Sequence, residues 1–194
     1  MLRIVLIYIV AFAALTATDI GSTLWATAVG QGQEFNHAVA TDDGLLHVER
    51  LLIINGAVLL FTVVMLIWAL RNRRRVDPRY LEWPERAVFN YFYLNPFSAK
   101  NMPKSVLHYM ALALVILFFK VFVSINNSLI ALNIPDLATP LAMAVTKFVG
   151  AGVAAYWIVI FILFHPMWWI ALRIVAGALR DGDVPAADDP LAVR

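Results

Sequence analysis

Cysteine is absent from this 194-residue chain, and charged side chains are scarce. Without cysteine there is no disulfide framework, no thiolate metal site and no cysteine nucleophile. Asp, Glu, Lys and Arg together make up 14% of the residues, against about 25% in soluble domains. Hydrolase, zinc-protease, Walker and dinucleotide-binding signatures are also missing from the sequence, so no short motif indicates an enzyme.

Apolar residues account for 62% of the chain, whereas soluble domains contain about 45–50%. The excess is concentrated in runs that meet the length of about 20 residues needed to cross a bilayer. We therefore predict an all-α, polytopic membrane protein that forms a single transmembrane domain over residues 1–194. The expected spanning helices are residues 4–29, 51–70, 107–132 and 140–166.

The last apolar run continues to residue 179, which is too long for one straight crossing. Proline removes a backbone donor and clashes with the preceding helical turn, so Pro166 is expected to kink or end the fourth spanning helix. Trp168 and Trp169 follow at once, as is typical of the headgroup level of a membrane. We therefore predict an interfacial helix over residues 168–180, followed by a polar tail over 181–194.

Lysine and arginine are distributed unevenly, and their distribution predicts the orientation of the chain. Most of them belong to the loop 71–106 and to the two ends of the chain. Basic residues gather on the cytoplasmic side, so this loop and both termini are expected in the cytoplasm. The basic cluster after the second span predicts contact with anionic lipids rather than with nucleic acid. Its residues are Arg71, Arg73, Arg74 and Arg75.

Three ionisable residues lie within the apolar runs, where a charge is costly unless it is paired or hydrated. Asp19 and Lys120 each lie roughly 15–18 Å below the outer surface at 1.5 Å per residue. Their equal depth and opposite charge predict a buried ion pair. Lys147 enters from the outside to a depth of about 10 Å, where it either extends back to the surface or joins the same cluster.

Other polar residues follow the same helix faces. Thr16, Asp19, Thr23 and Thr27 form one stripe, and Lys120, Ser124 and Asn127 form another. These stripes predict a bundle with a polar outer half and a dry inner half. The small residues Ala142, Thr146, Gly150 and Ala154 predict a close-packing face on the fourth helix. The candidate ligand-binding residues are Asp19, Thr23, Glu34, Asn36, Asn55, Lys120, Ser124, Asn127 and Lys147.

The histidines raise the question of a metal or haem. His108 and His165 are both expected near the cytoplasmic face, on the third and fourth spans. A haem b with two histidine ligands between those helices is geometrically conceivable, but histidines at a membrane interface commonly have other roles. No cofactor is favoured.

Asp19, Thr23, Gly30, Glu34 and Asn36 together form a motif. It resembles the end of the first helix in a family of small uncharacterised prokaryotic membrane proteins, in which the pattern is Asp…Thr…Gly…Glu-x-Asn-Pro and a lysine follows in a later helix. His37 stands where that pattern has proline, and both Lys120 and Lys147 are candidates for the later lysine. The resemblance implies that Asp19, Thr23, Glu34 and Asn36 act as a unit, and it implies no activity.

The leading functional hypothesis is a non-enzymatic subunit or assembly factor of a larger complex in a prokaryotic inner membrane. Its partners would be the bilayer, including anionic lipids, and other membrane subunits. One alternative is a small transporter or lipid-headgroup-binding protein with an outward-facing polar pocket around Asp19 and Lys120. Another is a membrane-embedded enzyme that uses Asp19 or Glu34 as an acid or base.

Overall fold

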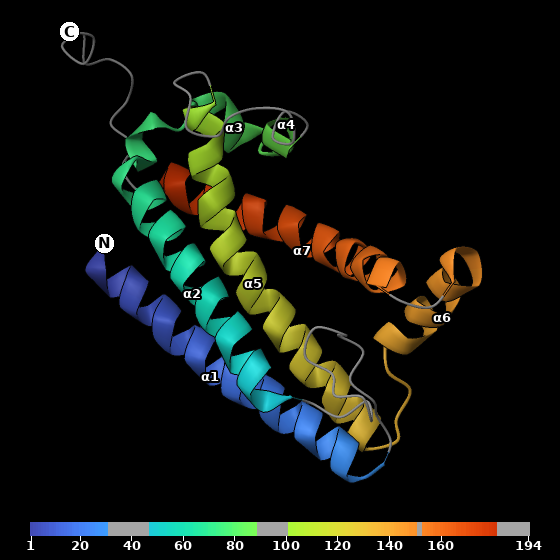
Figure 1. Cartoon of the computed structure of the whole chain (residues 1–194). Helices are drawn as coiled ribbons and strands as arrows, with labels where there is room; N and C mark the ends of the chain where they lie inside the picture. Colours follow the sequence, from blue (N-terminus) through green and yellow to red (C-terminus); the bar gives the residue numbers. More distant parts are fainter. Residues whose placement is uncertain (31–46, 89–100, 151–152, 182–194) are drawn as a thin grey trace, which may run out of the picture.

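The computed structural model describes residues 1–30, 47–88, 101–150 and 153–181. Within these ranges all regular structure is helical (Figure 1). Four helices are long and apolar enough to cross a membrane, which confirms the predicted fold class. They are α1 (Leu2–Ala28), α2 (Val48–Arg71), α5 (Met102–Ala131) and α7 (Val153–Asp181). The shorter elements are η1 (Arg73–Arg75), α3 (Pro78–Glu82), α4 (Glu85–Val88) and α6 (Ala138–Val149).

The helical form of these segments follows from their composition. Long runs of Leu, Ile, Val and Ala offer no side-chain partner to the backbone, and in lipid a helix is the one local structure that satisfies all of its own backbone groups. The 27 residues of α1 correspond to a length of about 40 Å. This length exceeds the ~30 Å hydrocarbon layer, so the helix has turns to spare at its ends.

Helices α1, α2 and α5 lie side by side and form a three-helix bundle (Figure 1). Val5, Tyr8 and Phe12 of α1 pack against Leu66 and Leu70 of α2, with Ala113 of α5 completing this buried cluster. Helix α5 is the most buried of the four long helices. It contacts α1, α2 and α7 and is therefore the central element of the fold.

The second half of α7 packs against the first half of α5 and against α3. Ala171, Leu172, Val175 and Ala176 join the largest buried cluster there. Figure 1 shows that α7 crosses α5 obliquely, so the two helices separate toward the start of α7. The fourth long helix therefore joins the bundle at one end instead of closing it along its length.

The first half of α7 packs on α6 instead. Val145 of α6 is buried with Ala155 and Val159 of α7. We call α6 together with residues 153–164 of α7 the α6–α7 lobe. Gly150 ends α6 with φ +79°, a conformation that residues with a Cβ rarely adopt.

Two predicted boundaries in this region are wrong. The fourth long helix begins at Val153 and not at residue 140, because the chain breaks at Gly150. The small residues 142, 146, 150 and 154 therefore do not share one helix face. The helix also continues through Pro166 to Asp181, so residues 168–180 belong to the same helix as the spanning segment. Proline weakens a helix locally, but tertiary contacts on both sides maintain it: Phe164 contacts Phe119, and Trp168 contacts His108.

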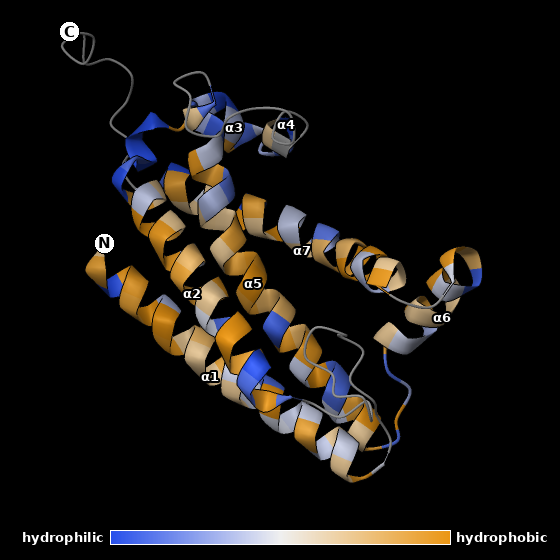
Figure 2. Ribbon diagram, viewed as in Figure 1, coloured by the Kyte–Doolittle hydropathy of each residue, from blue (hydrophilic) through white to orange (hydrophobic). Residues whose placement is uncertain are grey.

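The basic cluster gathers at one end of the molecule. The exposed basic residues lie at the end of α2 and in η1, and they are Arg71, Arg73, Arg74 and Arg75. Figure 2 shows that this end of the molecule, where η1 and α3 lie, is strongly hydrophilic. Asp77 caps α3 by accepting a hydrogen bond from the backbone N–H of Arg79 at 2.9 Å. The Arg79 guanidinium, which also donates to this carboxylate, lowers the pKa of Asp77 below its usual value. The observed cluster fits the predicted contact with anionic headgroups, which stays a prediction.

Candidate functional site

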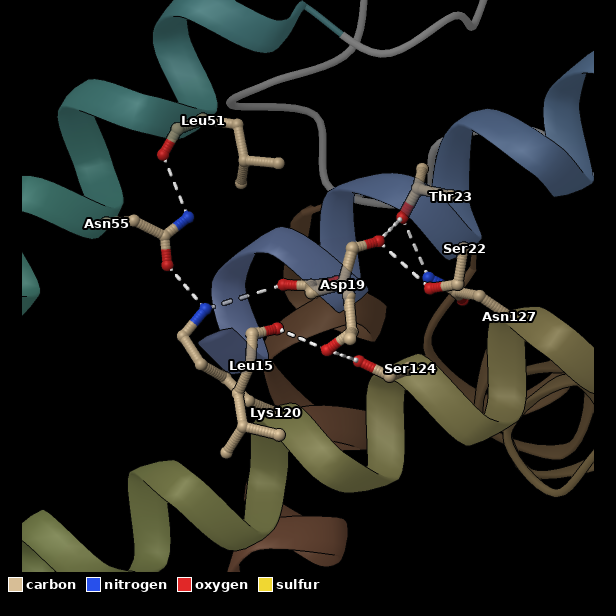
Figure 3. Close-up of polar contacts among 10 residues, drawn as sticks. Leu15, Asp19, Ser22, Thr23, Leu51, Asn55, Lys120, Ser124 and Asn127 are labelled. Carbon is tan, nitrogen blue, oxygen red and sulfur yellow. Dashed lines mark hydrogen bonds and ion pairs between the residues drawn. The ribbon is translucent and has the colours of Figure 1, made fainter. Parts of the chain in front are cut away.

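The main polar cluster of the molecule lies between α1, α2 and α5. The Lys120 ammonium on α5 donates to Asp19 Oδ2 on α1 at 3.5 Å and to Asn55 Oδ1 on α2 at 2.5 Å. Figure 3 shows the ammonium between these two acceptors. The predicted Asp19–Lys120 ion pair is therefore confirmed as a contact. The role of Asn55 as the closer partner was not predicted.

Both charges of the pair are largely removed from the surface. The side chain of Lys120 is 8% exposed and that of Asp19 is 14% exposed. The Lys120 ammonium also lies 4.9 Å from the centre of the Phe12 ring, a position in which the negative face of the ring attracts a cation. Removing either charge would leave the other buried and unpaired, which is far more costly than the pair itself.

Two further hydrogen bonds join α1 to α5 beside the ion pair. Asn127 donates from Nδ2 to Thr23 Oγ1 at 2.8 Å, and Thr23 in turn donates to the backbone carbonyl of Asp19 at 2.9 Å. The hydroxyls of Thr18 and Ser124 lie 3.3 Å apart. The two polar stripes expected from the sequence do face each other, and most of their groups satisfy one another (Figure 3).

Not every predicted residue joins this cluster. Lys147 is exposed on α6, so the alternative in which it joins Asp19 and Lys120 is wrong. Thr16 is buried, but its hydroxyl has no hydrogen-bond partner within the part of the chain that the structure describes. Glu34 and Asn36 lie outside the described residues.

The expectation of a dry inner half is also wrong. Tyr8 donates from its hydroxyl to Thr62 Oγ1 at 2.9 Å in a buried bond between α1 and α2. The tyrosine lies three turns before Asp19, on the side of the chain's N-terminus. Sequence reasoning missed this pair because a lone Tyr and a lone Thr in apolar runs carry no spacing signal.

The two candidate haem ligands have different surroundings. His108 is fully buried and donates from Nε2 to the carbonyl of Ala87 at 3.1 Å. His165 is exposed and accepts a hydrogen bond from Trp169 Nε1 at 3.1 Å. Among the described residues no group of three or more His, Cys, Asp or Glu side chains is arranged to hold a metal ion.

Asn126, which precedes Asn127 of the α5 stripe, has a definite structural role. Its Oδ1 accepts hydrogen bonds from the backbone N–H groups of Leu137 and Ala138, each at 3.0 Å. These groups begin α6 and would otherwise lack partners. The buried amide thus fixes the start of the α6–α7 lobe to the end of α5.

The fold and cluster together define a class: an all-α protein with four helices long and apolar enough to span a membrane. Comparison with protein-family models, with curated proteins and with solved structures finds no match for this chain.

Proposed function

We propose that this chain is a non-enzymatic integral membrane protein that acts as a subunit or assembly factor of a larger membrane complex. In this proposal both termini and the segment 71–106 lie in the cytoplasm of a prokaryotic cell. The orientation rests on the basic residues, of which Arg71, Arg73, Arg74 and Arg75 lie at the end of α2 and in η1.

The observation that carries the proposal is the α6–α7 lobe. Its buried cluster is formed by α6 and α7 alone, and α7 approaches the three-helix bundle mainly through its second half. As a result Trp157 and Phe161 are 62% and 60% exposed on the first half of α7. Large aromatic side chains are frequent anchors in protein interfaces. The lobe therefore suits a partner helix that covers these exposed aromatic side chains.

The polar cluster supports the same proposal. Asp19, Asn55 and Lys120 satisfy one another across three helices, and such hydrogen bonds stabilise membrane bundles without any further role. In this proposal the cluster has a structural role and holds α1, α2 and α5 together, and the lobe is the surface that binds a partner.

Purification of the untagged protein at its native level, followed by native mass spectrometry, tests the proposal. We expect another membrane protein to be recovered with it in fixed stoichiometry. The matched variants are Trp157→Ala/Phe161→Ala on α7 and Ile4→Ala/Ile7→Ala on the exposed face of α1. The first should lose the partner and the second should keep it. Recovery of the wild-type chain alone would contradict the proposal.

A second candidate function is a binding or transport pocket for a polar headgroup around Asp19. It is favoured by the length of the Lys120–Asp19 contact, 3.5 Å, and by Asp19 Oδ1, which accepts no hydrogen bond from the described residues. The double variant Asp19→Asn/Lys120→Met removes both charges. If that variant is as stable as the wild type and is fully active in the cell, this second candidate is wrong.

A further inference from the structure

A groove of about 460 Å³ lies at the end of the molecule where α3, α4 and the last turns of α7 meet. Residues 81–85 form one wall, and Arg173, Ala176, Gly177 and Arg180 form the other. The groove is separate from the polar cluster around Asp19. It also lies at the end that carries the basic cluster (Figure 2).

The charges in this groove have both signs and balance. Glu82 and Glu85 come from one wall, whereas Arg173 and Arg180 come from the other. Arg173 donates from Nε to Glu85 Oε1 at 2.7 Å and joins the two walls. The pKa of Glu85 is lowered, first by a bond from its own backbone N–H and then by Arg173, so this carboxylate is ionised at neutral pH.

The other two charges are less engaged. Arg180 lies 3.7 Å from Asp181 Oδ1, and both side chains are mostly exposed, so this pair contributes little. Glu82 is exposed, and no ion pair joins it to any residue that the structure describes. The weakly paired Arg180 and the exposed Glu82 therefore line the same groove from opposite walls.

The groove lies about one hydrocarbon thickness along α7 from the start of that helix. Arg173 follows Val153 by 20 residues, which is about 30 Å of helix and equals the thickness of the hydrocarbon layer. Trp83 lines the groove and is 58% exposed. The guanidinium of Arg86 lies 5.6 Å from its ring centre. Exposed tryptophan and arginine are typical of the interface between lipid and water.

We propose that this groove binds the headgroup of a zwitterionic phospholipid of the ethanolamine type. The arginines of the α7 wall hold the phosphate, and the carboxylates of Glu82 and Glu85 accept hydrogen bonds from the primary ammonium. A choline headgroup has no N–H to donate, so it loses the second set of bonds. An anionic headgroup without an ammonium would place its phosphate beside both carboxylates and leave Glu82 without a partner.

The experiment places purified, delipidated protein in nanodiscs that contain equal amounts of phosphatidylethanolamine, phosphatidylcholine and phosphatidylglycerol. Native mass spectrometry then identifies the lipid that stays bound after release from the disc. We expect phosphatidylethanolamine to be retained roughly tenfold over phosphatidylcholine, since charge-assisted hydrogen bonds distinguish the two. Equal retention of phosphatidylethanolamine and phosphatidylcholine by the wild-type protein, or a preference for phosphatidylglycerol, would overturn the proposal.

A matched pair of variants locates the site. Glu82→Gln/Arg180→Gln removes the two less engaged charges and leaves the Arg173–Glu85 bond in place. Asp77→Asn/Arg79→Gln removes one charge of each sign from an ion pair outside the groove. We expect the first variant to lose the ethanolamine preference and the second to retain it, with unchanged thermal unfolding in both. Loss in both variants, or in neither, would place the lipid elsewhere and contradict the assignment.

Discussion

The three-helix bundle and the α6–α7 lobe are both built from apolar helices, but they are held together differently. In the bundle, Lys120 joins α5 to Asp19 of α1 and to Asn55 of α2. In the lobe, α6 and α7 meet through Val145, Ala155 and Val159. Apolar contacts provide little preference for one helix partner over another in lipid, whereas buried polar bonds do.

This difference explains why the two regions have different shapes. Each polar bond in the bundle requires two particular helices to lie at a particular register, so α1, α2 and α5 stay together. The lobe has a glycine break at Gly150 and a polar anchor at Asn126. The position of α7 relative to the bundle is therefore determined mainly at its second half, where Leu172 and Val175 are buried.

The largest expected effect is the loss of one charge from the ion pair. Lys120→Met or Asp19→Asn alone should destabilise the protein by about 3–5 kcal/mol, because the remaining charge is buried without its opposite charge. Thermal unfolding in detergent measures the effect. Lys147→Met, at an exposed lysine, is the matched control and should change little.

The double variant Asp19→Asn/Lys120→Met should recover most of that loss, since it leaves no buried charge. If the double variant is no more stable than the less stable single variant, the two charges do not act as a pair. That result would contradict the claim that buried polar bonds hold the bundle together.

The next effect concerns the lobe. Gly150→Ala meets no atoms within 4 Å but places a side chain at φ +79°, a strain of about 1–3 kcal/mol. We expect α6 to shift relative to α7 while the bundle keeps its structure. The absence of native cysteine allows spin labels at cysteines introduced at exposed sites, Met143 with Trp157 across the lobe and Ile7 with Leu60 across the bundle. Electron resonance distances should change for the first pair only; a change in the second would contradict the independence of the two regions.

A smaller effect is expected in the half of the bundle that contains the N-terminal part of α1. Tyr8→Phe removes the donor to Thr62 and should cost about 1 kcal/mol. Thr62 keeps its bond to the carbonyl of Val58, which limits the loss. Ile7→Val on the exposed face of the same helix serves as the control in the same unfolding assay. If Tyr8→Phe destabilised the protein as much as Lys120→Met, a bond between neutral groups would contribute as much as the buried ion pair, and this result would contradict the account.

The smallest effect is at the α3 cap. Asp77→Ala should cost roughly 0.5 kcal/mol, at the low end for an N-cap, because the element is short and near the surface. The pKa of Asp77 is lowered in the folded protein, so its contribution is present above the ordinary carboxyl pKa of about 4 and is lost as the pH falls through the lower folded value. Hydrogen exchange at the Arg79 amide should therefore differ between wild type and variant at neutral pH and converge in acid. A difference that persists in acid would be inconsistent with the cap.

The sequence predicted the class of the fold and the centre of the cluster, and the reasons are physical. Runs of apolar residues determine the length of each spanning helix. Two opposite charges buried at equal depth, Asp19 and Lys120, have few possible partners other than each other. Asn55 and Thr18 were harder to place because their contribution depends on helix rotation, which no single-residue pattern defines. The break at Gly150 was not predicted, because this glycine was assigned to a small-residue packing face. The continuation of α7 through Pro166 was not predicted either, because it depends on contacts that Phe164 and Trp168 make with α5.

Site-specific photocrosslinking in living cells tests the central claim most directly, that the α6–α7 lobe is where this protein meets a partner subunit. A photoreactive phenylalanine derivative replaces Phe161 on α7 or Ile7 on α1, both of which are exposed. The account predicts a protein adduct of one defined mass from position 161 and adducts with lipid alone from position 7. Lipid adducts alone from both positions would contradict it.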